Sequence, residues 1–131
     1  MSIEPPALPD KFDWWNLRIG LDDYFFRIQQ WMLQRLVGDG VQTLSGAGAI
    51  LTTSLTTKWT TTGANAGTLM DGFEGQVKVI VLVVDGGDGT LTPSNLANYT
   101  TITFNDIGDS VVLQFLTGEW WVIANNGCTL A

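Results

Sequence analysis

The stretch "SVVLQFLTGEWWVIA" (residues 110–124) holds two runs of β-branched, aromatic and aliphatic residues on either side of Thr117–Gly118. Residues of these types favour pleated strands, and a two-residue turn containing glycine is the commonest connection of a β-hairpin. The sequence therefore predicts a hairpin in which Phe115 lies opposite Trp120.

Both faces of this hairpin are apolar. Successive side chains of a strand point to opposite faces, so each face collects one alternating set. One set is Val111, Leu113, Phe115, Trp120, Val122 and Ala124; the other, with Leu116 opposite Glu119, is Val112, Gln114, Leu116, Glu119, Trp121 and Ile123. The run "VIVLVV" has the same property. Strands with two apolar faces are covered on both sides, so we predict that Leu116, Trp121 and Ile123 meet a neighbouring subunit.

The rest of the chain after residue 40 is also rich in residues that favour β-strands. The first forty residues contain no threonine, whereas sixteen follow. Short β-rich runs recur at regular spacing between turns such as "DGGDG" and "NDIGD", which predicts an antiparallel β-sandwich, jelly-roll-like, over residues 41–131. Besides the two strands of the hairpin, strands are predicted at 41–45, 49–53, 56–62, 76–84, 89–92 and 100–104.

Residues 1–40 have a different pattern, which predicts an extended arm and a helix rather than β-strands. Three prolines between residues 5 and 9 predict an extended arm, and a helical pattern follows over about 10–37. Its apolar residues are spaced by three and four, as in a heptad seam, with a second row beside it. The seam is Trp14, Leu17, Leu21, Tyr24, Ile28 and Trp31, and the second row is Phe25, Met32 and Leu36. So wide an apolar face needs a partner, so we predict an amphipathic anchoring helix.

Composition and charge narrow the class of protein. The 131 residues are 45% hydrophobic and 15% charged, with a net charge of −7. This argues for a globular chain and against binding to nucleic acid or to an anionic membrane. The N-terminus lacks the features of a signal peptide, and no apolar run is long enough to span a bilayer. We therefore expect assembly in the cytoplasm.

No pattern of catalytic residues emerges. The chain has no histidine and one cysteine, Cys128, which excludes histidine-dependent triads, histidine-ligated metals and an internal disulfide. The carboxylates that could form a glycosidase-like pair stand in turn-like contexts, where they serve backbone geometry. These are Asp71, Glu74, Asp106, Asp109 and Glu119. We expect a non-enzymatic protein without a cofactor or metal.

The loop "VDGGDGTLTP" (84–93) begins like a calcium-binding nonapeptide, but leucine stands at position 91, where that motif needs aspartate. A glycine-held turn is the better interpretation. Trp59, Trp120 and Trp121 could stack on sugars, although packing in a core or an interface is favoured. Trp59 remains the candidate for a glycan contact.

Five segments from residue 71 onward resemble, in order and spacing, a β domain of structural proteins from tailed bacteriophages, especially marine and cyanobacterial ones. They are "DGFEGQVKVI" (71–80), "LTPSNL" (91–96), "TTITFNDIGDSVVLQF" (100–115), "GEWWVI" (118–123) and "NNG" (125–127). With the threonine-rich lead-in the resemblance spans roughly residues 43–131. Asn98, Tyr99 and Cys128 depart from the small residues expected there.

The resemblance implies a virion component that forms a homotrimer, either a capsid decoration (cement) protein or a short head fibre, docked on the major capsid protein or another virion protein. It transfers no catalytic or binding residues. A tail-fibre component that binds host-surface glycan is the alternative.

Overall fold

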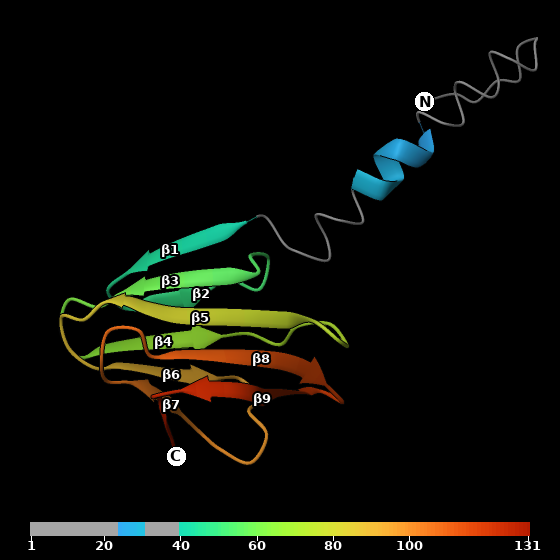
Figure 1. The fold of residues 1–131 in the computed structure, drawn as a ribbon. Helices are drawn as coiled ribbons and strands as arrows, with labels where there is room; N and C mark the ends of the chain where they lie inside the picture. The colour runs from blue at the N-terminus through green and yellow to red at the C-terminus, as the bar shows by residue number, and fades with distance from the viewer. Residues whose placement is uncertain (1–23, 31–39) are drawn as a thin grey trace, which may run out of the picture. The chain divides into compact units, whose positions relative to one another are not determined.

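The computed structural model describes residues 24–30 and 40–131. The chain divides into two compact units, Met1–Leu33 and Gln34–Ala131. In the first unit residues 24–30 form a helix (Figure 1). The proline-rich arm and the rest of the predicted helix lie outside the described residues. So do six of its predicted interface residues: Trp14, Leu17, Leu21, Trp31, Met32 and Leu36.

The second unit is built from β-strands. Within the described residues these are β1 (Val41–Ser45), β2 (Gly48–Ile50), β3 (Thr56–Thr60), β4 (Asn65–Leu69), β5 (Val77–Val84), β6 (Gly89–Pro93), β7 (Ile102–Phe104), β8 (Ser110–Leu116), β9 (Glu119–Asn126) and β10 (Thr129–Leu130). They form two sheets (Figure 1). Sheet 1 has the order β1-β3-β5-β8-β9, and sheet 2 has the order β10-β7-β6-β4-β2. The prediction of a mainly β domain is confirmed.

The sheets are mixed, and the prediction of an antiparallel sandwich is wrong for the first six strands. These strands alternate between the sheets, so every second strand returns to the same sheet in the same direction. Strands β1, β3 and β5 are therefore parallel, as are β2, β4 and β6. Each parallel crossover is itself a strand of the facing sheet, which is how a β-solenoid winds.

The last four strands close this coil in antiparallel fashion. The predicted hairpin is confirmed, with Phe115 opposite Trp120 and Leu116 opposite Glu119. Its turn has positive φ at Thr117 (52°) and Gly118 (82°), the signs that a type I′ turn requires.

One side chain of the hairpin departs from the predicted alternation. The register between β8 and β9 shifts so that Leu113 pairs with Val122 but Val112 pairs with Ala124. Ile123 is the extra residue, and it is 57% exposed. A β-bulge of this kind moves all later residues to the opposite face. Ala124 therefore leaves the set facing the core, and Asn125 lies opposite Val111.

The core fills the space between the two sheets. Two fully buried tryptophans dominate it, and each packs edge-on against a phenylalanine: Trp59 with Phe104 at 5.6 Å and Trp120 with Phe115 at 5.2 Å between ring centroids. Each indole N–H donates to a backbone carbonyl, of Gly46 and of Met70 respectively. A buried tryptophan needs such a partner. The other core members are Ile50, Leu69, Ile80, Leu82, Leu91, Ile102, Val111, Leu113 and Cys128.

Strand β4 was not predicted, because "NAGTL" has little β propensity. Its neighbours on both sides, β2 and β6, hold it in place. The middle residue of β4 is Gly67, and a Cβ at this position would lie 2.8 Å from the ring of Trp59. Glycine at this position makes room for the largest core side chain.

The glycine-rich loop after β5 is a turn, as predicted. Thr61 Oγ1 accepts from the Gly86 N–H and donates to the Gly87 carbonyl, tying the loop to the preceding turn of the coil. Asp85 Oδ1 accepts from the Gly87 N–H. At Gly87 (φ 149°) a Cβ would meet the backbone of Gly63 at 2.5 Å, so only glycine fits.

Candidate interaction surface

The outer face of sheet 1 is apolar at its centre. Burial alternates along β5, with Ile80 and Leu82 in the core and Val79 and Val81 partly exposed on the opposite face. Cross-strand pairing joins Val79 to Val112 on β8. We call this surface the apolar strip, and its members are Val77, Val79, Val81, Val112, Leu116, Trp121 and Ala124.

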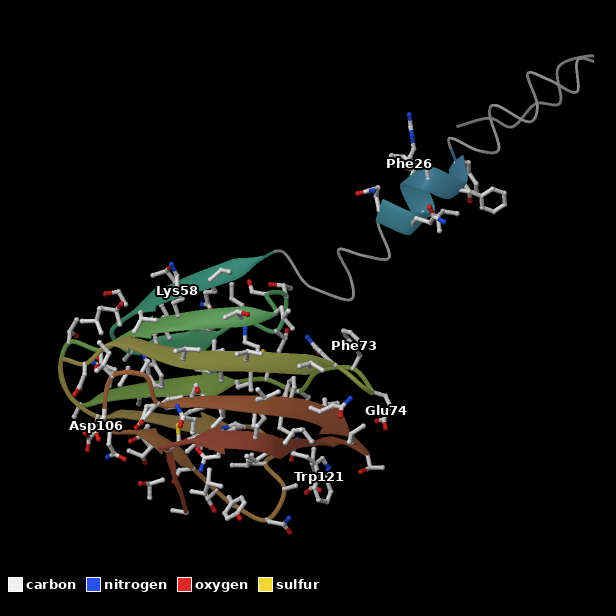
Figure 2. The ribbon with its side chains drawn as sticks, in the orientation of Figure 1. Phe26, Lys58, Phe73, Glu74, Asp106 and Trp121 are labelled. Carbon is white, nitrogen blue, oxygen red and sulfur yellow. The ribbon has the colours of Figure 1, made fainter. Side chains whose placement is uncertain are left out.

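Charge is confined to the margins of the apolar strip. Lys58 lies on β3 beside Val81, and Glu119 lies on β9 beside Leu116. Lys58, on β3, and Trp121, on β9, lie toward opposite edges of sheet 1 (Figure 2). Gln114 of β8 lies on the same face, paired with Val77 and Trp121, so a polar side chain interrupts the apolar strip. An apolar centre with polar margins is the usual composition of a protein–protein contact.

The three β-domain residues predicted to meet a subunit all lie outside the core. Trp121 is partly exposed, and its indole N–H donates to the Leu116 carbonyl at 2.9 Å, so the fold brings these two together on the apolar strip. Ile123 lies at the bulge. Their contact with another chain stays a prediction.

The helix of residues 24–30 exposes aromatic rings. Tyr24, Phe25 and Phe26 are each between 58% and 59% exposed, and the rings of Tyr24 and Phe25 meet edge-on at 6.3 Å. Ile28 is partly buried, and Phe26 projects from the helix (Figure 2). The sequence analysis did not include Phe26 in either apolar row.

Trp59 does not lie at the surface. Its ring is 0% exposed because β3 turns it between the sheets, so it is not available to stack on a sugar. The tryptophan predicted as a glycan contact is a core residue. In strands of this length, alternation alone cannot tell which face will be inside.

Two of the candidate carboxylates, Asp109 and Glu74, accept hydrogen bonds from the backbone, and a third, Asp71, accepts them from a side chain. Asp109 Oδ2 accepts from the N–H groups of Asn105 and Asp106 and organises that turn. Glu74 accepts from the Thr117 N–H, and Asp71 accepts from the side-chain amide of Asn95. These bonds match the turn role expected from the sequence.

Lys78 is a buried titratable group that the sequence analysis did not single out. It is 0% exposed, on the inward-facing side of β5 with Ile80 and Leu82, and its Nζ donates to the Ser54 carbonyl at 2.7 Å. Burial lowers the pKa of Lys78 from its usual 10.5 to about 8. The alternation of "VKVIVLVV" was the signal: Lys78 shares the parity of two core residues.

The lowered pKa makes stability depend on pH. Below pH 8 Lys78 is protonated in both states, and the folded chain bears the full cost of a buried charge. Between pH 8 and 10.5 the unfolded state binds more protons than the folded state, so the free energy of unfolding rises with pH. Over this pH range we expect the free energy of unfolding of the native chain to rise by about 1–3 kcal/mol more than that of the Lys78→Met variant, as measured by urea denaturation.

The variant also serves as the control, because other groups titrate in this range. Burial and the charge of Asp109 raise the pKa of Cys128 to about 12, so ionisation in the unfolded state lowers stability above pH 9 in both proteins. The difference between the two profiles isolates Lys78. Parallel profiles would mean that its ammonium is not desolvated.

Residues 24–30 and 40–131 hold no group of three or more acidic or cysteine side chains that could bind a metal ion. Among the same residues, no helix has the length and apolar character needed to cross a bilayer. No protein-family model matches the sequence, and a search of curated proteins finds no significant relative.

Proposed function

We propose that this chain is a non-enzymatic structural protein of a tailed-bacteriophage particle. It forms a homotrimer through its β domain and docks on the particle through its N-terminal segment, as a capsid decoration protein or a short head fibre. The observation that carries this proposal is the apolar strip. In a solitary domain that face of sheet 1 would stand in water, whereas in an oligomer it is covered.

The N-terminal end of the β domain supports docking at that end. Strand β1 is the edge of sheet 1, and residues 41–57, which include all of β1 and β2, contain no charged residue and no proline. Edges that stand alone in solution are normally protected by charge, proline or a bulge. In the sequence, Tyr24, Phe25 and Phe26, whose rings are exposed, precede this strand.

The opposite edge of sheet 1, strand β9, is covered in part by a loop. On β9, Trp120 donates its backbone N–H to the Asn95 carbonyl and accepts from the Ala97 N–H, so a loop covers this edge. Strand β10 has only two residues. The difference between the two edges of sheet 1 favours attachment to the particle at the β1 edge rather than at the β9 edge.

The oligomeric state tests the proposal directly. Sedimentation velocity of the full chain at micromolar concentration should give a species of three times 14.3 kDa. A monomer at every concentration would overturn it. Counting copies per particle then separates the locations: hundreds indicate the capsid, whereas tens or fewer indicate the tail.

A second candidate is a tail-associated component that binds glycan on the host surface. The tryptophan first considered for this role is buried, but the described part of the chain has a polar surface hollow at another place.

A further inference from the structure

A hollow of about 350 Å³ opens between the β6–β7 connection and the start of β9. The hollow is open to solvent, since six of its eight lining residues are exposed. The lining residues are Thr92, Pro93, Ser94, Asn95, Leu96, Tyr99, Thr100 and Glu119. We call it the β6–β7 hollow.

The walls of the β6–β7 hollow are held rigidly. The Asn95 carbonyl and the Ala97 N–H both bond to the backbone of Trp120, at 2.8 and 2.9 Å. The Ser94 N–H donates to the Leu69 carbonyl at 2.9 Å, and the Thr100 N–H donates to the Ala131 carbonyl at 2.6 Å. The connection is therefore fixed at both ends and in the middle. A preformed wall lowers the entropic cost of binding a ligand.

The side chain of Asn95 is also held. Its Nδ2 donates to both oxygens of the Asp71 carboxylate, at 2.8 and 2.9 Å. With the amide nitrogen occupied in this way, its Oδ1 is left as an acceptor for a ligand. Asp71 thus positions Asn95 and does not itself line the hollow.

The remaining polar groups of the hollow are unused. Within the described residues no hydrogen bond is made by the hydroxyls of Thr92, Ser94, Thr100 and Tyr99 or by the carboxylate of Glu119. Hydroxyls both donate and accept, so the hollow offers paired donors and acceptors beside one aromatic ring that is 41% exposed. Leu96, which is partly exposed, adds apolar surface.

The charge of the hollow restricts the ligand. Glu119 is its only ionisable group apart from the Tyr99 phenol, and no cation lines it. Phosphorylated, sulfated and carboxylated ligands would meet an uncompensated negative charge. A pyranose ring has hydroxyls at its edge and an apolar face that packs on an aromatic ring, which matches these groups.

We infer that the β6–β7 hollow binds a neutral saccharide, with Tyr99 against the sugar face and with Glu119 and Asn95 accepting from its hydroxyls. This inference deepens the second candidate function, glycan binding, on which it rests, and it does not depend on trimer formation, because the lining residues of the hollow belong to one chain. Trimerisation and sugar binding can succeed or fail separately.

Saturation-transfer NMR on the full chain tests the inference, with glucose, galactose, mannose and N-acetylglucosamine as neutral probes. At least one should give transfer signals, whereas glucuronate and N-acetylneuraminate should give none. Tyr99→Ala should weaken binding of the positive sugar by at least about tenfold, and Glu119→Gln should weaken it by a smaller factor. Retention on immobilised dextran or mannan then tells a surface polysaccharide from a free sugar.

Two matched variants control for nonspecific effects. Phe73→Ala removes an aromatic ring that is 51% exposed and lies outside the hollow, and Asp106→Asn neutralises an exposed carboxylate elsewhere. Both should bind the sugar like the native chain. The inference is wrong if no neutral sugar binds or if the acidic sugars bind equally well. It is also wrong if Phe73→Ala weakens sugar binding as much as Tyr99→Ala does.

Discussion

Trp59→Ala is expected to lower the free energy of unfolding of the β domain by about 3–5 kcal/mol, the usual cost of emptying a large aromatic site in a core. Trp59 is fully buried, packs edge-on against Phe104 and donates its indole N–H to the Gly46 carbonyl. Its neighbours include two glycines, which cannot extend side chains into the space. Urea denaturation at one fixed protein concentration measures the loss.

Trp59→Phe is the matched control, since it keeps an aromatic ring but gives up the indole hydrogen bond. We expect this variant to lose roughly half as much as the alanine variant, about 1–3 kcal/mol. A loss of sugar binding by Trp59→Ala with almost no change in stability would contradict the core position of this residue.

Val79→Asp is expected to dissociate the proposed trimer while leaving the β fold intact. Val79 lies near the centre of the apolar strip, and neither of its cross-strand neighbours, Thr56 and Val112, carries a positive charge that could neutralise a carboxylate. Burying an unpaired charge in each of three copies costs several kcal/mol. We expect at least a hundredfold rise in the dissociation constant, measured by sedimentation.

Within an isolated subunit the same substitution is mild, because the side chain then faces water. Val79→Thr, which keeps the β-branched shape, should retain most of the trimer. If Val79→Asp remains trimeric, the outer face of sheet 1 is not the contact, and another surface must hold the copies together.

The hairpin of residues 110–124 was predictable because its interactions are local. The two-residue turn fixes the register, and the alternation of apolar residues fixes the faces as far as Val122. Beyond that point the bulge at Ile123 moves Ala124 outward. Nothing in the sequence of β9 alone marks an extra residue, because the pairing with β8 decides it.

Strand direction in the first six strands was not predictable in this way. A hairpin and a crossing to the facing sheet use the same turn residues, so "SGAG" between β1 and β2 fits both. The parallel pairing of β1 with β3 depends on contacts between residues that are far apart in the chain. Only the packing of two sheets on a shared core selects it.

The sequence by itself determined the β class, the change of character near residue 40, the hairpin register and the excess of apolar surface, because these follow from local alternation and turn chemistry. The tertiary structure alone decided which alternating set is inside. It buried Trp59 and Lys78, left Val79 and Val81 facing outward, and brought Tyr99 and Glu119 to the lining of one hollow. A strand has two equivalent faces until a second sheet covers one of them.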